Sequence, residues 1–133
     1  MLEFDMKKEV ITVSGATRLP YSPAVKAGEY IFVSGQVGFK DAGGKEVAGI
    51  AAQTRQCLEK VKHILEEAGA SLDDVVKTTV FLSNANHFSE MNEVYRSYFA
   101  RDYPARSTVV AGPVFPGMLV EIECVAYCAS NRE

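Results

Sequence analysis

One arginine and two glutamates near the end of the chain are the residues whose types and spacing could do chemistry. Arg106 follows a proline in the β-branched run Pro104–Val110, and Glu121 and Glu123 lie in the alternating run Leu119–Tyr127. Both runs read as strands, because proline is tolerated at a strand start and a period of two is typical of β-structure. That period puts both glutamates on one face of the second strand. Placing charges in a half-buried sheet is costly, so the three residues are candidates for function.

The two runs are predicted to form a hairpin through Gly112-Pro113 and Pro116-Gly117. Arg106 would then lie at its mouth, where it either pairs with Glu121 or Glu123 or holds an anion. A guanidinium matches a carboxylate with two parallel hydrogen bonds. A partly buried glutamate can accept a proton from an attacking water if its pKa is raised. We expect Glu123 to be structural, tied to a cation at an interface.

Other chemistries find little support in the sequence. Ser34-Gly35 lacks the G-x-S-x-G context of a nucleophile, and His63 and His87 have no motif neighbours. Gly43-Gly44 is not followed by the residues of a phosphate-binding loop. Three cysteines lack metal-ligand spacing. We therefore expect no metal and no cofactor.

Helical and strand periods alternate along the chain. A stripe of apolar residues predicts a helix over residues 48–68 that ends at Gly69, and Asn84, Asn86 and Ser89 offer caps for a second helix reaching Phe99. Strands are predicted around 10–13, on both sides of Ala27-Gly28-Glu29, and over 75–82. The order strands, helix, strand, helix, strands predicts an α+β fold with two helices against one face of a sheet. The other face would stay apolar and open, which predicts a homo-oligomer.

Length and composition fit one ordinary domain. The chain has 133 residues, of which residues 1–9 are expected to be an N-terminal extension. A net charge of −3 without a basic cluster speaks against a nucleic-acid partner. No apolar run is long enough to span a membrane, the start does not read as a secretory signal, and the unpaired cysteines fit a reducing cytoplasm.

Taken as an ordered set, short motifs from about Val10 to Ala126 resemble the RidA (YjgF/YER057c/UK114) family. The motifs are Leu19–Gly28, Phe32–Gln36, Gln53-Thr54, Ala68–Ser71, Lys77–Leu82, Asn92–Tyr95, Pro104–Ser107 and Val120–Glu123. The resemblance implies a chorismate-mutase-like α+β fold assembled as a homotrimer, with sites in clefts between subunits. It also implies hydrolysis of reactive 2-imino and 2-enamino acids, small-molecule substrates, to 2-keto acids and ammonia.

Carried over by motif, Arg106 would hold the substrate carboxylate and Glu121 would position water. The pocket would be lined by Tyr21, Ser34, Gly35, Asn92 and the backbone at Thr108. Tyr21 could equally be an anchor for its own loop. Two features depart from the best-studied deaminases of this family, namely Thr108 in place of a cysteine and the loop 112–117.

Three alternative functions stay open besides the imine deaminase. One is a non-catalytic trimer that binds small carboxylates as a regulator. The resemblance also leaves room for a 2-aminomuconate-type deaminase and for an endoribonuclease that inhibits translation.

Overall fold

The computed structural model describes residues 7–15, 18–99 and 101–129, so residues 1–6 of the predicted N-terminal extension lie outside it. Within the described residues the chain forms six strands, two α-helices and two short 3-10 turns. In chain order these are β1 Glu9–Ile11, β2 Ala24–Ala27, β3 Tyr30–Val37, α1 Ile50–Glu67, the turn Leu72–Asp74, β4 Val75–Leu82, the turn Ala85–His87, α2 Phe88–Tyr98, β5 Ala105–Val110 and β6 Val120–Tyr127.

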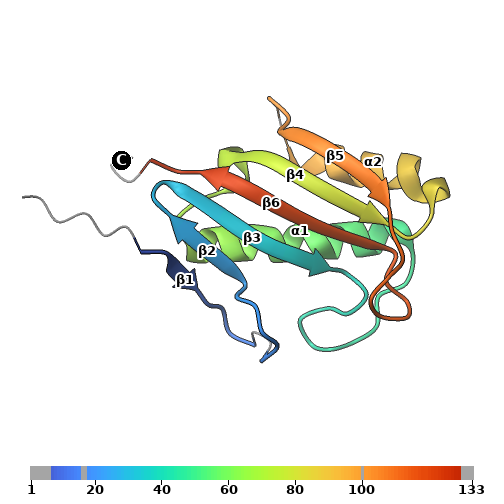
Figure 1. Cartoon of the computed structure of the whole chain (residues 1–133). Coiled ribbons are helices and arrows are strands. Elements are labelled where there is room, and N and C mark those ends of the chain that lie inside the picture. The colour runs from blue at the N-terminus through green and yellow to red at the C-terminus, as the bar shows by residue number, and fades with distance from the viewer. Residues whose placement is uncertain (1–6, 16–17, 100, 130–133) are drawn as a thin grey trace, which may run out of the picture.

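The strands form a single mixed sheet in the order β1-β2-β3-β6-β4-β5. Both helices lie on the same side of it (Figure 1). The predicted α+β class, with two helices against one face, is therefore confirmed. The predicted hairpin of β2 and β3 is also present, and its turn places Gly28 at a φ of 62°, a conformation that glycine adopts without steric cost.

The predicted hairpin of the last two strands is wrong. β5 pairs in parallel with β4 at the edge of the sheet, whereas β6 lies between β3 and β4 and is antiparallel to both. Two parallel strands need a long crossover, which α2 provides between β4 and β5. The loop after β5 then carries the chain past β4 to the centre of the sheet, so its Gly and Pro residues mark a long connection and not a tight turn.

The core lies between the sheet and the helices. The inward positions of β6 are buried as the alternation predicts: Val120, Ile122, Cys124 and Ala126. The apolar stripe of α1 packs against them. The helix ends at Glu67, one residue before its predicted end, and the predicted stop Gly69 has a φ of 85°. There the amides of Ala70 and Gly69 donate to the carbonyls of Leu65 and Glu66, which is the Schellman arrangement.

The alternation of β4 is interrupted at its start. Thr78, Val80 and Leu82 are buried, and strict alternation would put Val76 on their side, yet Val76 is exposed and Val75 is buried. A bulge between Val75 and Lys77 inserts one extra residue against β6 and shifts the alternation before it.

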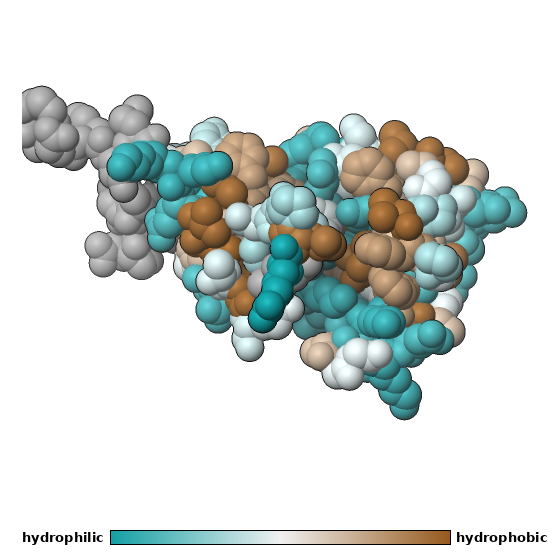
Figure 2. All heavy atoms as spheres, turned by 60° about the horizontal axis from the view of Figure 1, so that its bottom comes forward, coloured by the Kyte–Doolittle hydropathy of each residue, from teal (hydrophilic) through white to brown (hydrophobic). Residues whose placement is uncertain are grey.

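The sheet face opposite the helices carries apolar side chains without a cover from this chain. Phe32 and Val109 are close to half exposed there, as are Tyr30 and Tyr127, whose rings contact each other across β3 and β6. The space-filling view shows exposed apolar residues interspersed with polar ones on the surface (Figure 2). A second copy remains the predicted cover for this face.

None of the helices in the described chain is long and apolar enough to cross a membrane.

Candidate functional site

Arg106 projects to the helix side of the sheet. On β5 it is paired directly with Thr78 of β4, which is buried and exchanges a 2.7 Å hydroxyl hydrogen bond with Tyr95 of α2. The guanidinium carbon lies 4.8 Å from the centre of the Tyr95 ring and 5.7 Å from that of Phe88. These two rings hold the cation by its attraction to their π-faces.

Arg106 forms no ion pair with a carboxylate among residues 7–15, 18–99 and 101–129. The interpretation that Arg106 is neutralised by Glu121 or Glu123 is therefore wrong within one chain. Its guanidinium opens onto a cleft of about 270 Å³, here called the arginine cleft, lined by Asn92, Tyr95, Arg96, Tyr103, Pro104 and Arg106. No carboxylate is among these lining residues, so the arginine cleft is suited to an anion.

Glu121 lies on the opposite side of the sheet. It pairs with Phe81 on β4, and both residues face away from the helices. Partial burial, and after it the negative charge of Glu123, raise the pKa of the Glu121 carboxyl above its ordinary value of 4.5. Glu121 and Glu123 line a cleft of about 190 Å³, here called the glutamate cleft, together with Gly112 and Pro113 of the loop that departs from the family pattern. A carboxyl with a raised pKa in a cleft is suited to proton exchange.

Gly35 is the residue that makes room for the Glu121 carboxylate. A Cβ atom added at Gly35 would collide with Oε2 of Glu121 and lie 2.9 Å from its Cδ. The register of β3 against β6 shifts between Val33 and Gln36, so Gly35 sits at an irregular point of the strand. A side chain at this position would therefore displace the flexible Glu121 carboxylate from where it lies.

The other predicted site residues lie in the arginine cleft, beside Glu121, or at a third cleft. Ser34 Oγ donates a 2.6 Å hydrogen bond to the carbonyl of Ser22, which fastens the loop that carries Tyr21. Tyr21 and Gly35 both line a larger cleft of about 500 Å³ between that loop, β3 and α1. Asn92 lines the arginine cleft. Thr108 pairs with buried Val80, so it shares the helix side with Arg106.

The structure therefore brings Arg106 together with Asn92 and, separately, Glu121 together with Gly35. It does not bring Arg106 and Glu121 together. Thr78 and Phe81, their partners on β4, are three residues apart and point to opposite faces. A site that uses both side chains at one substrate must take them from two copies of the chain.

Sequence reasoning missed Arg96 and Tyr103, and it quoted Gln53 within a family motif without giving it a role. Arg96 and Tyr103 line the arginine cleft, and no motif marked either of them. Buried Gln53 donates to the carbonyls of Val47 (3.0 Å) and Gly117 (2.9 Å) and accepts from the amide of Leu119 (3.0 Å). It ties the loop before β6 to α1. A polar residue three after Ile50 and four before Cys57 was the available signal, since that spacing lies on the apolar stripe.

Comparison with known proteins gives a consistent picture. The family model described as Endoribonuclease L-PSP matches residues 12–128. A RutC family protein of Pyrococcus abyssi is 47% identical over 125 residues, which are 92% of this chain and 98% of that protein. The human 2-iminobutanoate/2-iminopropanoate deaminase is 40% identical over 108 residues, covering 80% of this chain and 79% of the human one.

A solved structure shows the same fold. E. coli TdcF with bound serine superimposes with a TM-score of 0.84 at 33% identity, over 91% of this chain and 99% of that one. That relative was solved with serine, a small amino acid, bound to it.

Proposed function

The chain belongs to the RidA (YjgF/YER057c/UK114) family, and from this premise we propose that it hydrolyses reactive 2-imino and 2-enamino acids to 2-keto acids and ammonia. The oxygen of a water molecule bonds to C2 of the protonated imine, and a proton passes from that oxygen to the nitrogen. The C2–N bond then breaks and the remaining hydroxyl proton is released, so that nitrogen leaves as ammonia, which that proton can convert to ammonium, and the carbonyl forms at C2. The protonated imine is itself a strong electrophile, so the protein needs only to fix it and to direct the water.

The observation that carries the proposal is the Arg106 guanidinium, held by two rings and facing a cleft lined by no carboxylate. In that position it would bind the substrate carboxylate with two hydrogen bonds and so fix the orientation of C2. Asn92 lines the same cleft, and Thr108 would offer its backbone nearby.

Glu121 is proposed to come from a neighbouring copy and to accept the proton of the attacking water. Its raised pKa supports this role, because a base works best when its pKa approaches the working pH. Gly35 leaves space for that carboxylate, and Tyr21 and Ser34 would complete the wall on the same copy. The homotrimer with sites between subunits is part of this proposal, and the uncovered apolar sheet face supports it.

A coupled assay tests the proposal. A pyridoxal-phosphate-dependent threonine or serine dehydratase releases the enamine, and keto acid formation is followed with and without this protein. Wild type should accelerate keto acid release, and Arg106→Ala should abolish the gain. Arg55→Ala, which removes an exposed arginine of α1 outside the clefts described above, should behave as wild type. Failure of wild type on every small imine would refute the proposed function.

The same variants separate an enzyme from a regulator that only binds. In an enzyme, Glu121→Ala should stop turnover. In a regulator, Glu121→Ala should bind small carboxylates as wild type does, and no variant would turn them over.

A further inference from the structure

The arginine cleft contains a second cation that the proposed reaction does not use. Arg96 lines the cleft together with Arg106 and follows Asn92 by four residues on α2, so one turn of helix presents both Asn92 and Arg96 to the same space. Two guanidinium groups and no carboxylate lie on the wall of the cleft, and the one carboxylate that pairs with Arg96, Glu93, is not among the lining residues.

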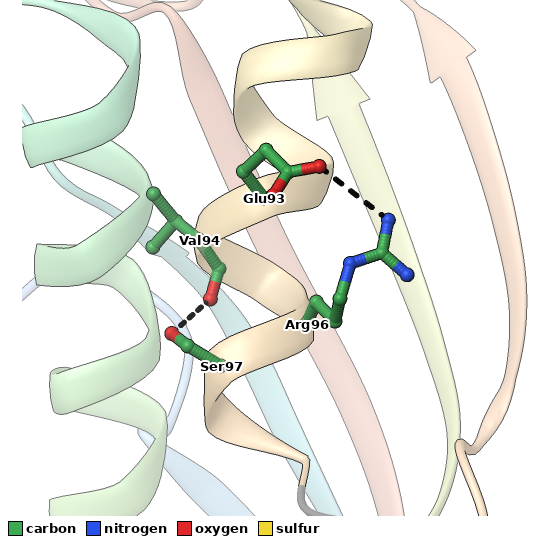
Figure 3. A network of polar contacts seen from close by, with 4 residues as sticks. All are labelled: Glu93, Val94, Arg96 and Ser97. Atoms are coloured by element: carbon green, nitrogen blue, oxygen red, sulfur yellow. Dashed lines mark hydrogen bonds and ion pairs between the residues drawn. The ribbon is translucent and has the colours of Figure 1, made fainter.

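The interaction that Arg96 makes leaves it available for a ligand. Its Nη2 lies 3.6 Å from Oε2 of Glu93, and the two side chains are 58% and 76% exposed. Exposed ion pairs at this spacing contribute little, so a ligand anion can replace the glutamate. Arg96 extends from the side of α2 that faces away from α1, whereas Val94 and Ser97 lie on the side facing α1 (Figure 3).

A substrate with one carboxylate would occupy Arg106 and leave Arg96 facing solvent. A substrate with a second carboxylate at its far end would neutralise both cations. The cleft volume of about 270 Å³ leaves room for more than a three- or four-carbon acid. Tyr103, 54% exposed, supplies an aromatic wall against which the intervening carbons could pack.

We infer that the preferred substrates are 2-imino or 2-enamino dicarboxylates of four to six carbons, with Arg106 binding the carboxylate next to C2 and Arg96 the distal one. This inference rests on the proposed function, because it names the substrate class of the same site. The reaction that supplies the substrate would then be one that oxidises or eliminates from an acidic amino acid.

The test compares two imines made in situ by amino-acid oxidation, 2-iminoglutarate and 2-iminobutanoate. Wild type should show the higher kcat/KM for 2-iminoglutarate. Arg96→Gln should lower the ratio of the two kcat/KM values roughly tenfold, the effect of losing about 1.4 kcal/mol from one charge-assisted contact. Glu93→Gln, which removes the competing carboxylate, should raise the ratio. Arg55→Gln, which removes an exposed cation of α1, should leave it unchanged.

A binding measurement separates this inference from the proposed function. Calorimetric titration with 2-oxoglutarate and 2-oxobutanoate needs no turnover, and wild type should bind the dicarboxylate more tightly, with the difference lost in Arg96→Gln. Equal affinity of wild type for both acids, or an equal loss for both in Arg96→Gln, would overturn the inference even if imines are hydrolysed. Dicarboxylate preference without hydrolysis of any imine would refute the proposed function and leave Arg96 as the distal carboxylate-binding residue.

Discussion

Mixing two inactive variants should restore activity if the site is shared between copies. Arg106→Ala removes the carboxylate-binding group from the helix side of the sheet, and Glu121→Ala removes the proposed base from the open face. Each variant alone should lose activity at least a hundredfold, since breaking a charge-assisted contact to the substrate costs about 3 kcal/mol or more. In a mixed oligomer, an intact Arg106 can meet an intact Glu121 from the other variant.

The expected recovery follows from counting. When equal amounts of the two variants assemble at random, half of the chains keep Arg106 and half of their neighbours keep Glu121. About one quarter of the sites are then complete, whatever the number of subunits in the closed oligomer. Wild type assembled with the double variant should also give about one quarter of the all-wild-type activity, whereas sites contained within single chains would give about one half.

The assay is co-expression of the two variants in equal amounts with one shared tag, so that all oligomers are purified in their random proportions, followed by the coupled dehydratase measurement. Native mass spectrometry establishes that mixed oligomers have formed. Mixed oligomers of the two single variants that remain as inactive as either parent would refute the shared site. A value near one half for the wild-type mixture would place the complete site within one chain.

Three further perturbations follow from single contacts. Gly35→Ala should lower kcat at least tenfold by displacing the flexible Glu121 carboxylate, with little change in thermal unfolding. The control is Gly43→Ala, because a Cβ at Gly43 would meet only ordinary van der Waals contact. An unchanged kcat in Gly35→Ala would contradict the proposed role of Glu121 as the base. Because the pKa of Glu121 is raised, the folded state holds this proton more tightly than the unfolded chain, and stability is lost as pH rises through the folded pKa. Glu121→Gln should therefore raise the Tm at pH 7, by an amount that shrinks toward acid pH, and an unchanged difference across pH would contradict the burial argument. Tyr95→Phe should lower the free energy of unfolding, measured in urea, by about 1–3 kcal/mol, because it leaves the buried Thr78 hydroxyl without its hydrogen bond. The double variant Tyr95→Phe with Thr78→Val should recover part of that loss. Additive losses from the two substitutions would show that the lost hydrogen bond is not the cause.

The local elements could be predicted from sequence because their signals are local. The stripe from Ile50 to Leu65 needs only the helical period, and the end of α1 needs only a glycine able to adopt positive φ. The inward face of β6 needs only its alternation. The bulge at Val76 escaped prediction because it depends on the register against β6, which no short window of sequence contains.

In the candidate site, too, some residues could be predicted from sequence and others depended on the tertiary structure. The family motifs singled out Arg106, Asn92, Gly35 and Glu121 by residue type and position, and partial burial of Glu121 now supplies the raised pKa that its proposed role as a base required. Arg96 escaped because an arginine on an exposed helix face looks like any solvated charge. Its importance comes from the neighbouring loop that places Tyr103 and Pro104 beside it.

By itself the sequence determined which side chains share a face of a regular helix or strand, because helical and strand periods are properties of the backbone alone, and the bulge of β4 is a departure from it. Only the tertiary structure decided which strands are neighbours. Inserting β4 between β5 and β6 replaced the expected hairpin, and it set Arg106 and Glu121 on opposite faces of one sheet. Strand order depends on long-range pairing and on the crossover through α2, and for that reason the separation of the two groups could not be read from their spacing in the chain.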